Sequence, residues 1–472
     1  MIRVDCDVLV VGSGPGGSMT SVRLAESGVD VLLVEEGKHL HVESSPDHSL
    51  AQMDEKWRSG GLTAALGNPK VTYVEGRCVG GASESNAGLY HAPIASVLDG
   101  WARDFGIDEF GFDALGVHLD SVVNEIGVSK RPGAYSPASD ALAAGADAMG
   151  WDWAEIERFW RYTDPGQPGG GERRSMSETL IPKMVAAGGR LMSGTRIDRI
   201  ERKGRRAVAA LGVSDGQPIR IEFRDVVVCA GAIQTPRLLR NSGWSHVGDG
   251  LTLNPMVRIV ARFPEPVNVP SYGVPVVQIE EFKPAMTLGC SYSAPPHLAM
   301  WLEGSPAEVR RSLEDWERMA VFYVKVCGQG SGTVRTMPVL GDAFVRYKTH
   351  ADDFAALSLG LSRLTEALFA AGATEVHSPL PGAGALRSAA DAQSLLGVLN
   401  GRNASLSAIH LHSTVRMGAE GRAGADSFGL LYGSDNVRVN DSSLLPTSPG
   451  VNPQGTIMAI ARRNVLRWMD ER

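Results

Sequence analysis

Three glycines near the N-terminus have the spacing that binding of a dinucleotide requires. Gly12, Gly14 and Gly17 fit the pattern GxGxxG. The first permits a tight strand-to-helix turn, the second lets the backbone approach a pyrophosphate, and the third allows close helix–strand packing. Pro15 and Gly16 lie between the second and the third. We expect a helix to begin here and to direct its free N–H groups and positive end at the phosphates.

An acidic residue follows at the spacing typical of a ribose-binding group. Glu35 lies 23 residues after Gly12, at the end of the next apolar run. A carboxylate there can accept hydrogen bonds from ribose hydroxyls. Glu36 is the competing acid, but the end of the strand favours Glu35. The fingerprint predicts a dinucleotide and leaves FAD and NAD both open.

The elements around the fingerprint predict a βαβ unit with parallel strands. Residues 5–11 are an apolar run, residues 16–27 have a helical pattern that ends before Gly28, and residues 29–34 are a second apolar run. Strand-like runs broken by Pro and Gly between residues 256 and 345 predict an antiparallel sheet. Helices are expected at 100–128, 136–149, 352–371 and from about Pro453, strands at 190–193, 207–213 and 219–228, and a loop at 163–173.

Size, charge and cysteine content exclude several classes of protein. A chain of 472 residues exceeds one ordinary core, so we expect two domains. The net charge of −7 argues against nucleic-acid or anionic-membrane partners, which need a basic face. The five cysteines include no CxxC pair, and no apolar run approaches the ~20 residues that span a bilayer. With no signal peptide before the first strand, we expect a cytoplasmic protein, and we expect no metal ion.

Four further blocks resemble the signature segments of the glucose–methanol–choline (GMC) oxidoreductase family. They occur in the family's order and, with the glycine fingerprint, cover nearly the whole chain. The resemblance implies an α/β fold, in which a Rossmann-like FAD-binding domain with a parallel sheet joins an antiparallel-sheet substrate domain with helices. The blocks are residues 76–88, 228–239, 248–255 (with Asn254 where His is usual), and 410–418 together with 437–456.

This resemblance also predicts how the chain divides. We expect a discontinuous FAD-binding domain made of residues 1–100, 175–256 and 405–472. The substrate-binding domain would comprise residues 101–174 and 257–404. The sequence leaves the oligomeric state open.

The first block resembles the family's loop beside the isoalloxazine ring, with backbone N–H groups near flavin N5. The resemblance carries this role to Gly81, Ser83 and Asn86. Some relatives attach FAD through a His directly before that Asn; here the residue is Ser85, so we expect non-covalent FAD. The other residues that we expect at the cofactor are Glu36, Arg77, Gly80, Ala230, Gly231, Asp441, Asn452, Pro453 and Thr456.

The last block implies the chemistry, oxidation of an alcohol to a carbonyl by hydride transfer to flavin N5. A His suits removal of the hydroxyl proton. The family's base lies four residues before Thr414, at His410, and its partner is Asn452, 42 residues further on. Asn452 would hydrogen-bond the substrate oxygen as alkoxide character develops. His412 would face the same side of a strand and is the alternative base, although the motif register favours His410.

Some assignments stay open. Asn452 precedes Pro453, which also fits a helix start with Asn as N-cap and Pro at the first position. His91 closely follows the flavin loop and has no assigned role. The expected partners are a small-molecule alcohol and O₂ or another electron acceptor. The alternative function is a lyase of the hydroxynitrile lyase type, in which FAD is structural.

Overall fold

The predicted βαβ unit opens a seven-stranded sheet. It consists of β1 (Ile2–Val11), α1 (Pro15–Glu26) and β2 (Val31–Val34), as predicted. β1 pairs in parallel with β2 on one side and with β12 (Gln217–Val228) on the other. The remaining strands are β9 (Arg190–Met192), β10 (Thr195–Lys203), β11 (Arg206–Ser214) and β24 (Val437–Val439). The computed structural model describes residues 1–41, 44–46, 49–162, 171–337, 339 and 341–472.

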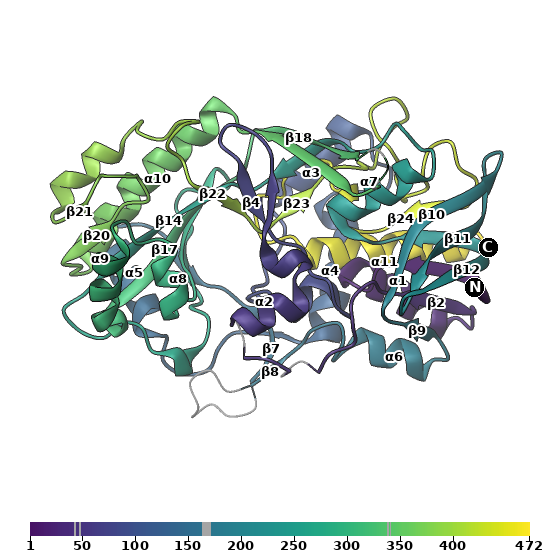
Figure 1. The fold of residues 1–472 in the computed structure, drawn as a ribbon, viewed down its shortest axis with the longest axis horizontal. Helices are drawn as coiled ribbons and strands as arrows, with labels where there is room; N and C mark the ends of the chain where they lie inside the picture. The colour runs from purple at the N-terminus through teal and green to yellow at the C-terminus, as the bar shows by residue number, and fades with distance from the viewer. Residues whose placement is uncertain (42–43, 47–48, 163–170, 338, 340) are drawn as a thin grey trace.

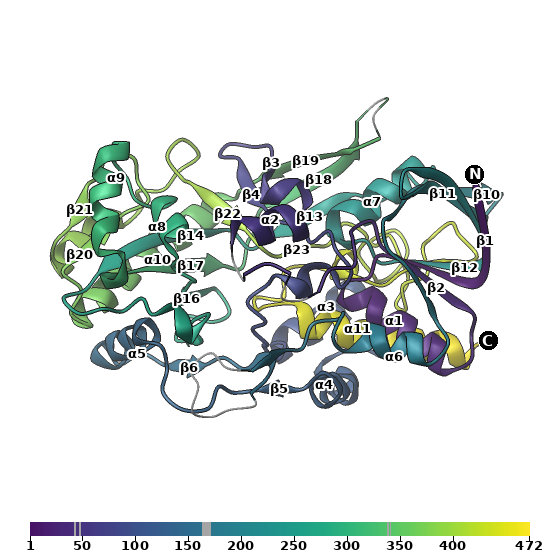
Figure 2. The same cartoon turned by 60° about the horizontal axis from the view of Figure 1, so that its bottom comes forward.

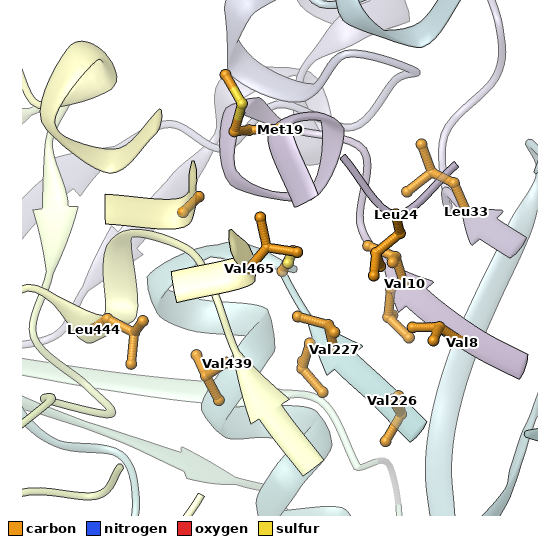
Figure 3. Packing of buried hydrophobic residues seen from close by; sticks show 14 of the residues in the cluster. Val8, Val10, Met19, Leu24, Leu33, Val226, Val227, Val439, Leu444 and Val465 are labelled. Atoms are coloured by element: carbon orange, nitrogen blue, oxygen red, sulfur yellow. The ribbon is translucent and has the colours of Figure 1, made fainter. Parts of the chain in front are cut away.

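The central strands of this sheet are apolar because both faces are covered. Val8 and Val10 of β1 and Val226 of β12 are fully buried (Figure 3). α1 packs against α11 (Gln454–Asp470), the last helix, and both lie beside the sheet (Figure 1). Burial on both faces explains the continuous hydrophobic runs from which the strands were predicted.

One predicted helix is two. Residues 100–128 were expected to form a single helix, but α3 (Ala95–Phe105) ends at Gly106, whose φ is 62°. A left-handed residue at this position terminates a helix, and glycine adopts it without strain. α4 (Phe112–Ile126) follows and packs against α11. α5 (Pro137–Met149) begins and ends as predicted.

A ten-stranded sheet forms the other half of the molecule (Figure 1). Its centre is β14 (Met256–Arg262), β17 (Met319–Val326) and β16 (Met286–Cys290), paired antiparallel as predicted. The long helix α10 (Ala351–Ala370), also predicted, covers one face, where a Cβ at Gly360 would lie 2.3 Å from Val324. The other strands are β3 (Thr63–Ala65), β4 (Val71–Tyr73), β6 (Trp153–Glu155), β15 (Val277–Ile279), β20 (Glu375–His377), β21 (Ala385–Leu386) and β22 (Leu406–Ala408).

Alternation along β17 separates a core face from a polar face. Phe322 and Val324 belong to the hydrophobic cluster beneath α10. Tyr323 and Lys325 therefore point to the opposite face of the sheet. On this opposite face, Lys325 Nζ donates to Asn452 Oδ1, just before the last helix.

Smaller elements connect the sheets. Figure 2 shows the segment from α4 through α5 to β6 running along one edge of both halves, where β6 pairs with β15. β13 (Asp249–Leu253) and β23 (Leu411–His412) pair antiparallel near the middle of the molecule. Of the described helices, none is long and apolar enough to cross a bilayer. The remaining elements are β18 (Ser331–Thr336), β19 (Ala343–Lys348), β5 (Val128–Ser129), β7 (Arg158–Arg161), β8 (Glu172–Arg173), α2 (Leu50–Lys56), α6 (Leu180–Ala186), α7 (Gly231–Asn241), α8 (Pro295–Ala299) and α9 (Pro306–Ser312).

The loop predicted at residues 163–173 lies largely outside the described residues. Only its end is described, and there Glu172–Arg173 forms β8, which pairs with β7.

Candidate active site

The fingerprint glycines have three different physical roles. Gly12 has a φ of +100°, and a Cβ there would lie 2.4 Å from the carbonyl oxygen of Cys229. A Cβ at Gly17 would lie 1.9 Å from the carbonyl oxygen of Gly12, so this glycine lets α1 approach the strand. Around Gly14, in contrast, no described atom lies within 4 Å of an ideal Cβ. The space above Gly14 is where a pyrophosphate can approach the backbone.

The predicted flavin loop lies directly against this fingerprint. A Cβ at Gly81 would lie 2.9 Å from the Cα of Gly14. The backbone N–H of Gly80 donates to Ser13 Oγ at 3.0 Å. Two segments 67 residues apart in sequence therefore form one small-residue surface.

A buried carboxylate that we did not predict orders the flavin loop. Glu84 Oε2 accepts hydrogen bonds from the hydroxyls of Ser175, at 3.0 Å, and Ser177, at 2.7 Å. Ser83 Oγ donates to the carbonyl oxygen of Gly80 at 2.8 Å. These bonds fix the short turn Gly81–Glu84 that follows Gly80.

The two acidic residues after β2, Glu35 and Glu36, have different partners. Glu35 is buried, and its carboxylate accepts from the backbone N–H groups of Ser13, at 3.0 Å, and Gly37, at 2.9 Å. Burial raises the pKa of Glu35, and these hydrogen bonds oppose that rise. Glu36 forms ion pairs with Arg58 and, at 3.0 Å, with Arg77. The structure thus places Glu35 beside the fingerprint and joins Glu36 to Arg77.

The start of α7 is tied to the C-terminal block by Asp441. Its carboxylate accepts from the N–H of Gly231 at 2.8 Å and from Thr235 Oγ1 at 2.5 Å. The N–H of Ser443 donates to the other carboxylate oxygen at 2.7 Å. Asp441 therefore positions Ala230 and Gly231, and no described atom lies within 4 Å of an ideal Cβ at Gly231.

The start of α11 differs from the prediction in one respect. The N-cap is Pro453 and the helix begins at Gln454, so the prediction that Asn452 caps this helix is wrong. Asn452 Oδ1 instead accepts a hydrogen bond from Lys325 Nζ at 3.2 Å. Gln454 Oε1 accepts from Asn86 Nδ2 at 2.8 Å, which joins this helix start to the flavin loop.

These features fit FAD. The buried hydroxyls Ser85 Oγ and Thr456 Oγ1 have no hydrogen-bond partner among the described residues. In the described part of the chain, neither α1 nor α11 has a side-chain N-cap, so their first N–H groups are available to an acceptor. Buried polar groups of this kind are normally satisfied, and a bound dinucleotide supplies the acceptors and donors.

The two histidines of the last block lie close together. The ring centroids of His410 and His412 are 6.4 Å apart. His412 is fully buried on β23, and its Nδ1 lies 3.4 Å from Thr252 Oγ1. Burial and the nearby Lys325 lower the pKa of His412 to about 3. Burial, Lys325 and His412 also hold the pKa of His410 well below its ordinary value.

Sequence reasoning missed Lys325, whose charge acts on both histidines. It is 3% exposed, and burial and the charge of Lys283 lower its pKa to about 8. Its charge lowers the pKa values of His91, His410 and His412, so all three rings lie within its electrostatic reach. The available signal was a lysine inside the apolar run of β17.

His91, left open by the sequence, also belongs to this cluster. Its Nε2 lies 3.0 Å from Gln278 Oε1, and Gln278 Nε2 donates to Tyr323 Oη at 2.7 Å. Burial and nearby Lys325 lower the pKa of His91 to about 3. The site therefore combines residues of the C-terminal block with polar residues of the ten-stranded sheet.

Comparisons with known proteins agree with this geometry. Residues 53–256 and 334–461 match family models for GMC oxidoreductases, and residues 5–67 match an FAD binding domain. The chain is 34% identical to a GMC-type oxidoreductase of Sinorhizobium fredii, covering 98% of this chain and 94% of that protein. It is 25% identical to a long-chain-alcohol oxidase of Arabidopsis thaliana, covering 98% and 68%. The solved structure of pyridoxine 4-oxidase from Mesorbium loti has the same fold, with a TM-score of 0.78, 20% identity, and coverage of 98% and 99%.

The first sheet has a parallel centre with a glycine fingerprint and an antiparallel edge, β10–β11–β12, and it is joined to a second, antiparallel sheet; together with the family matches, this architecture places the protein among the flavoprotein oxidoreductases. The chain belongs to the GMC oxidoreductase family. Its cofactor is FAD, and it is an oxidoreductase that acts on CH–OH donors.

Proposed function

We propose that the protein oxidises a small-molecule alcohol to a carbonyl, with His410 as the base and Asn452 as the group that orients the alcohol oxygen. One observation carries this assignment. Asn86 of the flavin loop donates to Gln454 at the start of α11, Lys325 donates to Asn452 just before that helix, and the charge of Lys325 lowers the pKa of His410. These observations support the assignment because they bring Asn452 close to the flavin loop and put His410 within the electrostatic reach of Lys325.

The proposed reaction divides the hydrogens of the CH–OH group. The O–H bond breaks and its proton moves to a neutral ring nitrogen of His410, while Asn452 holds the oxygen. The carbinol hydrogen leaves with the electron pair of the C–H bond, and the C=O double bond forms. When bound, FAD would supply the acceptor for this hydride at N5, and O₂ or another acceptor would then take up the two electrons.

The electrostatics favour His410 as a base. A base must be unprotonated, and the lowered pKa keeps the imidazole neutral at neutral pH. Its Nδ1 is buried and has no hydrogen-bond partner among the described residues. His412 Nε2 is likewise buried without a partner among the described residues, but its Nδ1 lies 3.4 Å from Thr252 Oγ1 and the whole ring is buried, which supports a structural role for that ring.

Anaerobic mixing with alcohols tests the proposal. The relatives include a long-chain-alcohol oxidase and a pyridoxine 4-oxidase, so the panel should contain aliphatic and aromatic primary alcohols, with sugars and sterols beside them. Bleaching of the flavin absorbance by one of these supports the proposal. Unchanged flavin with release of cyanide from a hydroxynitrile would instead support the lyase alternative.

A further inference from the structure

We propose that Lys325 is a further catalytic residue, whose ammonium group binds the substrate hydroxyl oxygen beside Asn452 and stabilises the negative charge that develops there. This inference rests on the proposed function of the same site. It assigns a role to a residue of β17 that lies outside every sequence block from which the site was predicted.

The burial of Lys325 requires an explanation. Lysines normally keep their charged head in water, and a buried charge is costly unless it is paired. Lys325 is 3% exposed, and its described hydrogen-bond partner is a neutral amide oxygen, Asn452 Oδ1 at 3.2 Å. In the described part of the chain no carboxylate forms an ion pair with it. Buried ionisable groups with shifted pKa values concentrate at functional sites.

The position of the ammonium group fits an oxygen ligand. An ammonium has three N–H donors, and the described contacts use one of them. Across the sheet, Lys325 pairs with Met256 of β14 and Thr287 of β16, which carry no charge. The alcohol oxygen that Asn452 is proposed to orient therefore lies within reach of the remaining N–H groups.

The surroundings give this buried charge a large effect. The titratable groups around it are His91, His410, His412, Lys283, Cys327 and Tyr323. None of them carries a negative charge near neutral pH, and the imidazoles are neutral. A preorganised cation in such a site stabilises a developing alkoxide far more than it would in water. The same charge disfavours protonation of His410 and so keeps the base active.

The pH dependence of flavin reduction tests the inference. In the native enzyme, the rate should fall above about pH 8 as Lys325 loses its proton, and on the acid side only well below pH 6.5 as His410 gains one. Lys325→Met should cut the anaerobic reduction rate at pH 7 by about 10²–10³-fold, as for loss of an oxyanion donor. It should also abolish the fall in rate at high pH (the alkaline limb of the pH profile). The fall in rate at low pH (the acid limb) should move up toward the ordinary His pKa.

A charge-retaining variant sharpens this test. Lys325→Arg should keep the acid limb low, because the charge stays, and should lose the limb near pH 8, because a guanidinium does not titrate there. Lys283→Met removes a neighbouring charge that lowers the Lys325 pKa, so in this variant the fall in rate on the alkaline side should move above about pH 8 while Lys325 stays charged at pH 7. Its reduction rate at pH 7 should stay within about threefold of the native rate.

Binding of acetate provides a readout that needs no turnover. Acetate is a small anion that an ammonium group in the substrate site should bind, and perturbation of the flavin absorbance reports it. Affinity should weaken above about pH 8 in the native protein, and it should fall at least about tenfold in Lys325→Met, since charge-assisted bonds are lost. FAD content and Tm are measured beside both assays.

The two proposals fail in different ways. If no alcohol bleaches the flavin of the native protein, the proposed function fails, whatever acetate does. The inference about Lys325 is overturned if Lys325→Met reduces flavin within about threefold of the native rate with both limbs in place. It is equally overturned if the variant binds acetate as the native protein does, or if its loss of rate merely follows loss of FAD.

Discussion

Asn452 and Lys325 are joined by a hydrogen bond of 3.2 Å between the amide oxygen of the first and the ammonium of the second. Asn452 precedes α11, beside the nucleotide-binding sheet, and Lys325 belongs to β17, at the centre of the antiparallel sheet. The bond therefore ties the two halves together at the proposed site of chemistry, and it makes the two side chains electrostatically dependent on each other.

Replacing the amide by a carboxylate should expose this dependence. In Asn452→Asp the new carboxylate would face the ammonium of Lys325, and an adjacent opposite charge raises the pKa of a lysine. The fall in the rate of flavin reduction on the alkaline side should then move above about pH 8. The rate at pH 7 should decrease, because the ammonium charge is then paired with the new carboxylate and stabilises the substrate oxygen less. Stopped-flow reduction across pH measures both. An alkaline limb that stays in place would contradict this prediction.

The base is tested by comparing two histidines. His410→Ala should lower the rate of anaerobic flavin reduction by about 10²–10⁴-fold, the usual effect of losing a general base. FAD should stay bound, which the absorbance spectrum checks. His412→Ala should reduce the rate less, and it should lower Tm because it opens space beside Thr252 in a fully buried position. If His412→Ala proves the more damaging to reduction in a folded, FAD-loaded protein, the base is His412.

FAD should be released whole on denaturation. Ser85 occupies the position before Asn86, and a serine hydroxyl offers no imidazole nitrogen for a covalent link. Acid precipitation should leave a colourless pellet and all the flavin in the supernatant, where its fluorescence is measured. Yellow colour that stays with the pellet would show a covalent bond.

Retention of the cofactor should depend on Glu35 more than on Glu36. Glu35 lies beside the fingerprint loop and bonds its backbone at Ser13, whereas Glu36 is committed to Arg58 and Arg77. Glu35→Ala should weaken FAD retention with the fold intact. The measurement is the flavin-to-protein absorbance ratio after gel filtration, with circular dichroism as the check on folding. Full occupancy in Glu35→Ala, or a greater loss in Glu36→Ala, would assign the ribose to another group.

The buried charge of Lys325 should lower the free energy of unfolding of the protein. Its pKa is lowered from 10.5 to about 8, so between these values the unfolded chain binds more protons than the folded one. The free energy of unfolding therefore rises with pH between about pH 8 and pH 10.5. Below about pH 8, burial of the charged lysine lowers the free energy of unfolding by about 3 kcal/mol. Lys325→Met should remove this pH dependence and raise Tm at pH 7. Thermal unfolding from pH 6 to pH 10 measures it, and a Tm lower than that of the native protein would contradict it.

Local patterns predicted the parts of the fold that local physics determines. The turn at Gly12 and the helix at Gly17 follow from backbone conformation and close packing, which a glycine spacing reveals. The break between α3 and α4 was missed because apolar spacing continues through the left-handed Gly106. The prediction of Asn452 as N-cap failed because its side chain found a partner on β17, and sequence spacing cannot show a contact across 127 residues.

Lys325 is the clearest example of a site residue that the sequence could not predict. In the sequence it is one polar residue in an apolar strand. Its proposed role depends on which face of the sheet it occupies and on its contact with Asn452, 127 residues further along the chain. The motif register, in contrast, predicted His410 and Asn452; Lys325 donates to Asn452, and its charge lowers the pKa of His410. The predicted domain boundaries, the cofactor contacts of individual residues and the cytoplasmic location stay predictions.

The backbone of Gly16 lies against the far end of the chain, since a Cβ there would be 2.0 Å from the carbonyl oxygen of Asn440. The Asn440 side chain donates to Thr20 of α1 and to the backbone of Ala461 in α11. The nucleotide loop is thus synthesised before the segment that supports it, since Gly16 precedes Asn440 and Ala461 in the chain. Pairings so distant in sequence form late in folding. A nascent chain that ends before Asn440 therefore lacks part of the support of the nucleotide loop.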